Sequence, residues 1–408
     1  MRSVVDYSLP LVDAAVADGV MHLGFRRRDG KRVEISPGKW VTEFINCSYL
    51  GLDMQREVVA SYRGIPRDWG IGFCCARTRL SLEKNRELET ALSRLFDARA
   101  VVFPSVTSTH MSVMPLVASG ALIGAKGGVR LIFDKLAHSS MQYLRPILEK
   151  EAEVVVIEHN RIDRLQDEVE DAERRGLTPV YVSDGVYSMG GACPIEKVRR
   201  LLQDTSLRWY VDDAHGTSLY GTRGEGFVIA SCGGVLPPKT ILTFSLAKAF
   251  GATGGGVLVR RAEQERLVRY FGQTYAFSAP MDYGAIAASM TLIRLHQNGS
   301  VARLQRRLAE RIDVFNRAFG GDQDGFPIRS VVIGDERAAI RVARQLLDAG
   351  CLVNCAFFPT VSRGKAQLRI SLSAAHSLAE VRGLAEMLKR LGVRAAEDGV
   401  LALGEKRA

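Results

Sequence analysis

The central part of the chain alternates short apolar runs with amphipathic stretches, a pattern typical of β-strands joined by helices. The runs that predict strands are residues 101–103, 129–133, 154–157, 179–182, 209–211, 240–244 and 257–259, and helical spacing occurs at residues 83–96, 162–175 and 195–204. Strands that alternate with helices in this way predict a mainly parallel sheet in an α/β domain.

The two ends of the chain follow other patterns. Residues 1–40 predict a helix and a short hairpin, and residues 41–45 predict a strand. After Pro280 the predicted strands are 331–333, 352–354 and 367–372, among helices at 285–296, 301–319, 336–349 and 378–391. We therefore predict an N-terminal arm (1–50), a large domain (51–284) and a smaller C-terminal α+β domain (285–408). The tail after Ala395 is expected to be weakly ordered.

The composition is that of an ordinary globular protein of about two or three domains. Of the 408 residues, 47% are hydrophobic and 25% are charged, and no run of about 18 apolar residues predicts a transmembrane helix. The N-terminus lacks a basic segment followed by an apolar one, and the seven cysteines are scattered without metal-ligand spacing. We therefore expect no secretory signal, no metal site, no disulfide framework, and a cytoplasmic location.

The net charge of +10 comes from arginines that are dispersed along stretches of amphipathic pattern. A solvated basic surface is the simplest interpretation, and since no recognisable nucleic-acid-binding module accompanies it, we expect no nucleic-acid partner. A basic surface also suits a substrate that carries a polyphosphate, such as a coenzyme A thioester.

Polar residues follow four of the predicted strands at their carboxyl ends. These residues are His138, Asp184, Asp212 with His215, and Lys248. Because ligands of open α/β sheets bind outside the carboxyl ends of the strands, this coincidence predicts a ligand site.

The lysine lies in the stretch ILTFSLAKAFGATGGGVLV, residues 241–259. Lys248 follows an apolar run and Ser245, and it precedes the glycine triplet 254–256. Apolar surroundings lower the pKa of a lysine and make its amine a nucleophile that forms a Schiff base. The alternative is a surface lysine beside a hairpin. The spacings GxGxxG and GxxxxGK[ST] are absent around the triplet, which argues against a nucleotide loop.

The remaining polar residues supply what a lysine-bound carbonyl cofactor requires: a carboxylate for a ring nitrogen, a flat side chain and an anion cradle. Asp212 or Asp213 supplies the carboxylate, and His138 supplies the flat ring. The Ser/Thr-rich helix start at 105–109 forms the cradle with Ser245, although simple N-capping is the alternative there. This set points to pyridoxal 5'-phosphate.

Six stretches that run in order along most of the chain carry a family resemblance. They are YLGL at 49–52, FDKLAHSSM at 133–141, SDGVYSMGG at 183–191, VDDAHGTSLYGTRGEG at 211–226, SLAKAFGATGGG at 245–256 and LRISLSAAH at 368–376. On these motifs the chain resembles the α-oxoamine synthases, a family of fold-type I pyridoxal-phosphate enzymes. The resemblance implies a fold-type I PLP-transferase architecture.

The resemblance implies four residues that act on the cofactor ring. Lys248 forms the Schiff base and later moves the α-proton of the substrate. Asp212 pairs with the ring nitrogen, His215 bonds the phenolic oxygen, and His138 stacks on the ring.

The resemblance also implies residues around the ring. Ser245 and the backbone of Val106 and Thr107 hold the phosphate, and Asp184 and Ser188 complete the cofactor contacts, with a helix cap as the alternative role for Ser188. Ser278 is expected to reach the phosphate of the neighbouring subunit in a homodimer with shared sites. Arg369 is expected to bind the carboxylate of the amino acid.

Several positions depart from the family pattern. Asn85 replaces a histidine within the divergent stretch 74–89, Cys47-Ser48 replaces the usual asparagine, Ser105-Val106-Thr107 replaces Ser-Gly-aromatic, and SMDG becomes SMGG at 188–191. His110 stands at a common asparagine position and is interpreted as filling space. Asp213 is interpreted as a turn residue, and His376 as either structural or functional. These departures favour specialised metabolism or signalling over a housekeeping role.

We therefore predict a homodimeric acyltransferase that uses pyridoxal phosphate. It condenses an amino acid with an acyl thioester of coenzyme A or a carrier protein, releases carbon dioxide, and yields an α-amino ketone. An aminotransferase or amino-acid lyase of the same fold is the second hypothesis, and a non-catalytic binding protein is the third. The presence of Lys248, Asp212 and His215 argues against the third.

Overall fold

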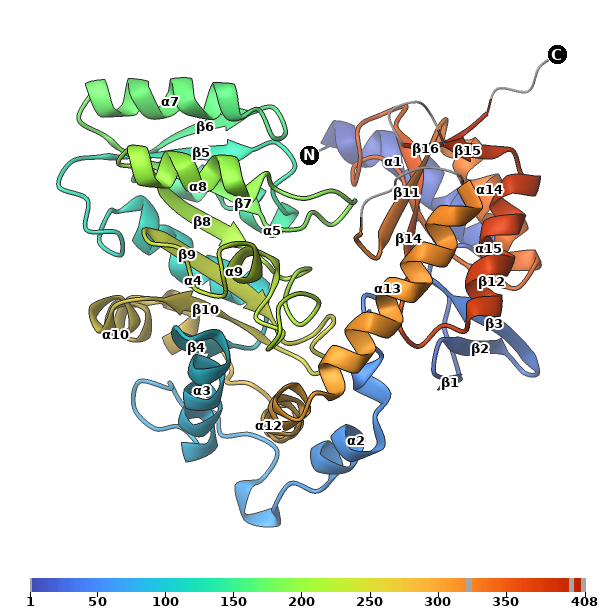
Figure 1. Ribbon diagram of the computed structural model, residues 1–408, viewed down its shortest axis with the longest axis horizontal. Helices are drawn as coiled ribbons and strands as arrows, with labels where there is room; N and C mark the ends of the chain where they lie inside the picture. Colours follow the sequence, from blue (N-terminus) through green and yellow to red (C-terminus); the bar gives the residue numbers. More distant parts are fainter. Residues whose placement is uncertain (1, 320–324, 396–399, 405–408) are drawn as a thin grey trace. The chain divides into compact units, whose positions relative to one another are not determined.

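The computed structural model describes residues 2–319, 325–395 and 400–404, which fold as two compact units (Figure 1). The larger unit is Leu52–Arg303, and the smaller unit combines Met1–Gly51 with Leu304–Ala408. This grouping differs from the predicted three parts. The N-terminal arm joins the C-terminal segment because β3 (Lys39–Glu43) pairs with β12 (Cys351–Leu352). Helix α12 (Tyr283–Gln297) stays with the larger unit because it packs against α2 (Arg56–Arg63) and α3 (Glu83–Phe96).

The larger unit is built on a seven-stranded sheet in the order β4-β10-β9-β8-β7-β5-β6. The strands are β4 (Arg99–Phe103), β5 (Val129–Asp134), β6 (Glu153–Ile157), β7 (Thr178–Asp184), β8 (Arg208–Asp212), β9 (Thr240–Ser245) and β10 (Gly255–Val259). Neighbouring strands pair in parallel from β6 to β9, and β10 runs antiparallel to both β9 and β4. The predicted mainly parallel α/β sheet is confirmed.

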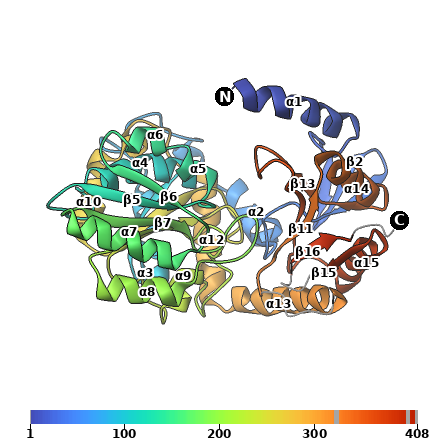
Figure 2. The ribbon, with the colours of Figure 1, turned by 90° about the horizontal axis from the view of Figure 1, so that it is seen from above.

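Helices cover both faces of this sheet. Helices α4 (Val106–Ala118) and α6 (Arg145–Leu148) lie on one face, and α7 (Ile162–Arg174) and α8 (Ile195–Asp204) lie on the other (Figure 2). Every residue of β5 and β9 is buried, which explains why the sequence shows continuous apolar runs rather than alternation. The core that α4 forms with the sheet includes Val113 of the helix and Phe103, Phe133 and Val182 of the strands.

The strand register aligns the carboxyl ends of the parallel strands. Asp184 at the end of β7 lies opposite Asp212 at the end of β8, and Asp212 lies opposite Thr243 of β9. Asp134 ends β5 beside β7. The polar residues that follow the predicted strands therefore meet at one edge of the sheet, as the sequence predicts.

Two residues of the glycine triplet, Gly255 and Gly256, begin a strand instead of forming a loop. Strand β10 starts at Gly255, two residues before the predicted run. A Cβ atom on Gly256 would lie 2.5 Å from the Phe244 ring and 2.5 Å from the Val101 carbonyl oxygen. The triplet therefore makes room for close packing inside the sheet between β9 and β4.

The smaller unit contains two sheets, ordered β1-β2-β3-β12 and β13-β14-β11-β16-β15. The remaining strands are β1 (Arg27–Asp29), β2 (Arg32–Ser36), β11 (Ile328–Gly334), β13 (Asn354–Ala356), β14 (Ala366–Ser371), β15 (Val393–Ala395) and β16 (Leu401–Leu403). The main helices are α1 (Arg2–Ala17), α13 (Ser300–Phe319), α14 (Glu336–Asp348) and α15 (Leu378–Arg390).

Two predictions about this unit are wrong. The predicted strand 352–354 is two strands, because Cys351 and Leu352 pair with β3 whereas Asn354 onward pairs with β14. The tail is not weakly ordered throughout: β16 pairs in parallel with β11, and Leu401 is buried. Residues 396–399 and 405–408 of the tail lie outside the described residues.

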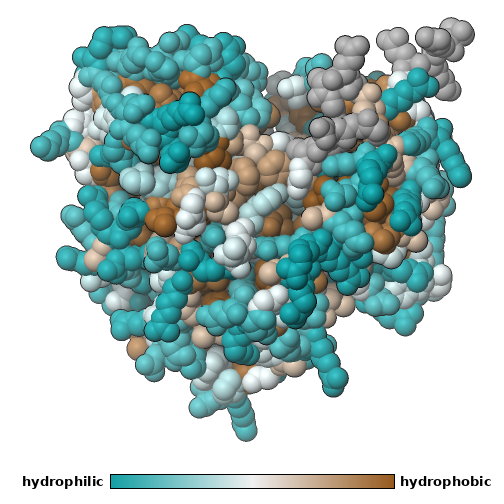
Figure 3. All heavy atoms as spheres, in the orientation of Figure 1, coloured by the Kyte–Doolittle hydropathy of each residue, from teal (hydrophilic) through white to brown (hydrophobic). Residues whose placement is uncertain are grey.

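Hydrophilic residues dominate the surface in the view of Figure 3, in agreement with the dispersed charges of the sequence. Among the helices of the described ranges, none has the length and apolar content needed to cross a bilayer.

His376 is a structural residue of the smaller unit. Its Nδ1 accepts a hydrogen bond from the Ser373 N–H at 3.0 Å, its Nε2 lies 2.9 Å from the Glu43 carbonyl oxygen, and its ring stacks on Phe44 at 4.2 Å. Burial lowers the pKa of His376 to about 4. In the larger unit, burial likewise lowers the pKa of His296 to about 4.

These two histidines predict a loss of stability in mild acid. Between the unfolded histidine pKa of about 6.5 and the folded value of about 4, the unfolded chain binds protons that the folded chain excludes. The free energy of unfolding should therefore fall as the pH falls, by up to about 1.4 kcal/mol per pH unit for each histidine. His376→Gln should reduce this slope, measured by urea unfolding at pH 7, 6 and 5. An unchanged slope would contradict the assignment.

Candidate active site

The site is organised around the carboxylate of Asp212, the last residue of β8, which is 4% exposed. Its Oδ1 accepts a hydrogen bond from the Ala214 N–H at 2.9 Å, and its Oδ2 lies 3.1 Å from His110 Nε2. Burial alone would raise the pKa of Asp212, but the His110 hydrogen bond and the nearby positive charge of Lys248 hold it below its usual range. The buried carboxylate is therefore ionised at neutral pH.

The ionisable groups around Asp212 have shifted pKa values. Burial and the negative charge of Asp212 raise the pKa of Asp184 well above its usual range, which favours the protonated form of Asp184. Burial lowers the pKa of His138, and the charge of Lys248 lowers it further. Lys248 is half-buried beyond the end of β9 and acts electrostatically on all three groups. The structure thus brings Lys248, Asp212, Asp184 and His138 into one cluster.

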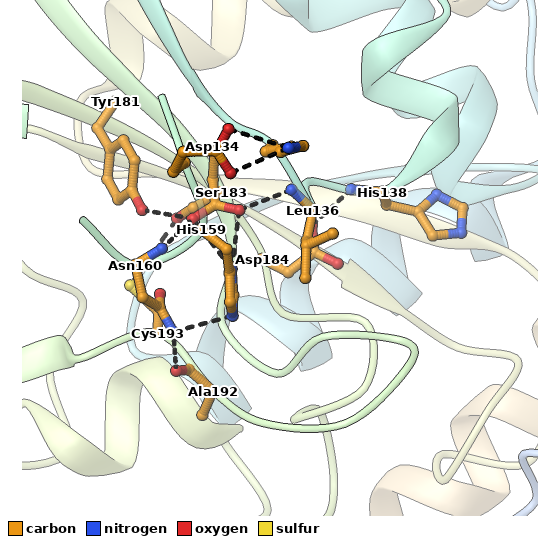
Figure 4. Close-up of polar contacts among 12 residues, drawn as sticks. Asp134, Leu136, His138, His159, Asn160, Tyr181, Ser183, Asp184, Ala192 and Cys193 are labelled. Atoms are coloured by element: carbon orange, nitrogen blue, oxygen red, sulfur yellow. Dashed lines mark hydrogen bonds and ion pairs between the residues drawn. The ribbon is translucent and has the colours of Figure 1, made fainter. Parts of the chain in front are cut away.

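The loop that carries His138 is held by two aspartates (Figure 4). Asp184 Oδ1 accepts a hydrogen bond from the His138 N–H at 2.9 Å, and Asp134 Oδ1 accepts one from the Leu136 N–H at 2.8 Å. The imidazole of His138 points away from Asp134 and lies with its Nδ1 2.7 Å from the Ser140 hydroxyl. These bonds fix the direction of a neutral aromatic ring.

A second set of contacts ties this loop to the strand beside it. Asp134 also accepts hydrogen bonds from the Asn160 N–H at 2.9 Å and the Tyr181 hydroxyl at 3.3 Å, and it lies 3.0 Å from His159 Nδ1 (Figure 4). Asn160 in turn donates to the Ala192 carbonyl at 3.0 Å. Asp134 therefore joins the loops that follow β5, β6 and β7.

The anion cradle is expected at the start of α4. Ser105 caps the helix through a capping box with Ser108, and the first N–H groups of a helix have no acceptor within it. Gly255 pairs with Ser245 across β9 and β10, and a Cβ on Gly255 would lie 3.0 Å from the Val106 nitrogen. The absence of a side chain at Gly255 thus lets the helix start approach Ser245. Val106 and Ser245 therefore lie on either side of Gly255, where the N–H groups and the positive end of the helix would favour an anion.

The other predicted cofactor residues have these positions. His215 is buried in the turn after β8, at 4% exposure. Ser188 is half-buried in the turn after β7, where Gly190 has φ of 102°, so the SMGG sequence places glycine where the backbone requires it. Ser278 lies in the loop between α11 (Gln273–Ala276) and α12, where its hydroxyl donates to the Ala279 carbonyl at 3.1 Å.

Arg369 belongs to the smaller unit, where it is 7% exposed on β14. Its guanidinium donates to the Ser371 hydroxyl at 3.1 Å, to the Tyr49 hydroxyl at 3.3 Å and to the Cys47 sulfur at 3.4 Å. The first and last of the six motifs therefore meet at this arginine. One departure from the family pattern, Cys47, lies directly against it.

These groups fit pyridoxal 5'-phosphate. The Asp212 carboxylate is buried and ionised, as a protonated ring nitrogen requires, and the amine of Lys248 lies near enough to influence its charge. The helix start beside Gly255 offers backbone donors to a phosphate, and the neutral His138 offers an aromatic face. The donor set therefore fits what the sequence analysis requires of a site for a lysine-bound cofactor: an amine, a carboxylate, a flat side chain and a place for an anion.

His110 and Tyr210 are the residues that sequence reasoning missed. His110 is fully buried and bonds Asp212, so interpreting it as a space-filling residue was wrong. Its Nδ1 lies 2.8 Å from the Tyr210 hydroxyl. Tyr210 precedes Asp212 by two positions on β8. Because side chains alternate between the faces of a sheet, this spacing indicates that both side chains lie on the same face.

Comparison with known proteins agrees with the geometry. The model of the aminotransferase class I and II family matches residues 80–388. An 8-amino-7-oxononanoate synthase from Xanthomonas campestris pv. campestris is 30% identical over 379 residues, covering 89% of this chain and 88% of the relative. The enzyme of the same name from Yersinia enterocolitica is 31% identical, covering 86% of this chain and 91% of its own.

A solved structure shares the fold. A serine palmitoyltransferase from S. paucimobilis superposes with a TM-score of 0.82 at 22% identity, covering 96% of this chain and 98% of that chain. The chain therefore belongs to the aminotransferase class I and II family and, within it, to the α-oxoamine synthases, which depend on pyridoxal phosphate.

Proposed function

We propose that this protein joins an amino acid to an acyl thioester and releases carbon dioxide and a thiol, leaving an α-amino ketone. The observation that carries the proposal is the cluster of Lys248 with the ionised Asp212 at the carboxyl ends of the strands. The relatives named 8-amino-7-oxononanoate synthase support it, since they match over most of the chain.

Bound pyridoxal phosphate supplies an electron sink for the pair of electrons left at the α-carbon of the amino acid. Asp212 holds a proton on the ring nitrogen, because an ionised buried carboxylate favours a positive partner. Lys248 holds the cofactor and moves the α-proton. His138 covers one face of the ring, His215 bonds its phenolic oxygen, and the start of α4 with Ser245 binds the phosphate.

Arg369 binds the carboxylate of the amino acid in this proposal. A planar guanidinium matches a carboxylate through two parallel hydrogen bonds, and partners at Ser371 and Tyr49 hold the side chain in one orientation. The Cys47 sulfur beside Arg369 changes the surroundings of that carboxylate relative to the usual asparagine. We infer that the substrate differs from those of housekeeping members, in specialised metabolism or signalling.

The proposal includes a cytoplasmic homodimer with shared sites, in which Ser278 reaches the phosphate of the partner. Phe277, beside Ser278, is 82% exposed and is available for a contact with the partner. Light scattering should give twice the mass of one chain. A single-chain mass at micromolar concentration would contradict this part of the proposal.

Lys248→Ala should abolish both cofactor attachment and turnover. Borohydride reduction followed by peptide mass spectrometry should find the cofactor on the peptide that contains Lys248 in the wild type only. Thiol release from an acyl thioester, measured in the presence of an amino acid, should fall by at least about a hundredfold. The matched control is Lys135→Ala, since Lys135 is an exposed lysine near the His138 loop that pairs with Glu158 at 2.9 Å.

The outcomes separate the candidate reactions. Thiol release that requires an amino acid, with an α-amino ketone found by mass spectrometry, supports the condensation. An amino acid converted without thiol release would instead indicate the aminotransferase or lyase. A wild type that takes up no cofactor would contradict the whole proposal. Varying the amino acid and the length of the acyl chain identifies the substrates.

Arg369→Lys should raise the KM for the amino acid by about tenfold or more, because an ammonium loses the bidentate geometry. The KM for the acyl thioester should change far less. Arg329→Lys is the control, since Arg329 is a buried arginine on neighbouring β11 that bonds Asn316. Equal effects on both substrates would argue against a carboxylate-binding role.

A further inference from the structure

Three buried side chains, Tyr210, His110 and Asp212, form a line of contacts that ends at the Asp212 carboxylate. The Tyr210 hydroxyl lies 2.8 Å from His110 Nδ1, and His110 Nε2 lies 3.1 Å from Asp212 Oδ2. Tyr210 is 1% exposed, His110 is 0% exposed and Asp212 is 4% exposed. His110 comes from α4 and the other two from β8, so the line bridges a helix and the strand beneath it.

The chemistry of the two end groups constrains the proton positions along this line. Burial and the negative charge of Asp212 raise the pKa of Tyr210 well above its usual range, so the hydroxyl keeps its proton. An ionised carboxylate has no proton to donate, so the His110 nitrogen that faces it must carry one. The Tyr210 hydroxyl lies at hydrogen-bond distance from Nδ1, and it donates there when the ring proton is on Nε2.

Both oxygens of Asp212 therefore have a fixed donor. The Ala214 N–H holds Oδ1 and the His110 N–H holds Oδ2. Each carboxylate oxygen has a further lone pair, so the group retains acceptor capacity for a ring nitrogen while its rotation is prevented. The other ionisable groups around it are Asp184, His138 and Lys248.

We propose that His110 is a positioning residue that orients the Asp212 carboxylate toward the cofactor ring nitrogen, with Tyr210 holding His110 in its Nε2–H tautomer. This inference rests on the proposed function only in assigning Asp212 to the ring nitrogen. It gives His110 a task in cofactor binding at a position where the family commonly has asparagine.

Two substitutions at His110 separate the hydrogen bond from the volume of the ring. His110→Phe keeps an aromatic ring and removes both nitrogens, whereas His110→Gln places an amide N–H near the position of Nε2. Loss of a hydrogen bond to a charged group should weaken cofactor binding by about tenfold or more in His110→Phe. His110→Gln should stay within about threefold of the wild type, measured by absorbance titration of cofactor-free protein.

Tyr210→Phe and Tyr181→Phe form a matched pair for the second bond. Both tyrosines are buried on adjacent strands, but the Tyr181 hydroxyl donates to Asp134 at 3.3 Å and not to His110. ¹⁵N NMR of histidine-labelled protein without cofactor should show a protonated Nε2 and an unprotonated Nδ1 at His110. Tyr210→Phe should shift the Nδ1 signal, and Tyr181→Phe should leave it in place. This NMR measurement requires neither the cofactor nor turnover.

The outcomes distinguish this inference from the proposed function. Wild-type protein that binds the cofactor, with His110→Phe binding it equally tightly, would overturn the role of His110 alone. Protonation of Nδ1 instead of Nε2 would overturn it as well. A wild type that binds no cofactor would overturn the proposed function and this inference together. If circular dichroism shows that His110→Phe does not fold, the ¹⁵N NMR spectra of the wild type and of Tyr210→Phe still test the role of His110.

Discussion

The structure depends on one buried negative charge. Asp212 lies at the end of a central strand, where an isolated carboxylate would gain a proton rather than stay charged. It remains ionised because His110 and the Ala214 N–H donate to its oxygens and because Lys248 is close. Asp184 lies opposite Asp212 in the register, and burial and the charge of Asp212 raise its pKa well above its usual range. The chain therefore holds an ionised carboxylate where a cationic ring nitrogen is expected to bind.

The fold and most of the site were predictable from the sequence because their signals are local. Strands β5 and β9 are buried throughout, so they appear as continuous apolar runs, and helices α3 and α8 were predicted to the residue from their spacing. Parallel strands then bring their carboxyl ends together, which is why His138, Asp184, Asp212 and Lys248 were expected in one place.

The remaining features depend on contacts between distant segments. The bond from His110 to Asp212 joins residues that are 102 positions apart, and nothing in the local pattern of α4 distinguishes a buried partner from a space-filling side chain. Residues 351–356 contribute strands to two different sheets, since β12 pairs with β3 and β13 pairs with β14. The single apolar pattern of this segment predicted one strand where two exist. Glycines 255 and 256 resemble a loop in sequence, but their neighbours Val106 and Phe244 come from other elements.

A crystal structure of the protein with pyridoxal phosphate tests the central claim most directly. The account predicts a covalent bond from the cofactor to Lys248 Nζ, with the ring nitrogen within hydrogen-bond distance of Asp212 and the phosphate at the start of α4. It also predicts that His110 keeps its contact with Asp212. A cofactor bound elsewhere, or a ring nitrogen turned away from Asp212, would contradict the account.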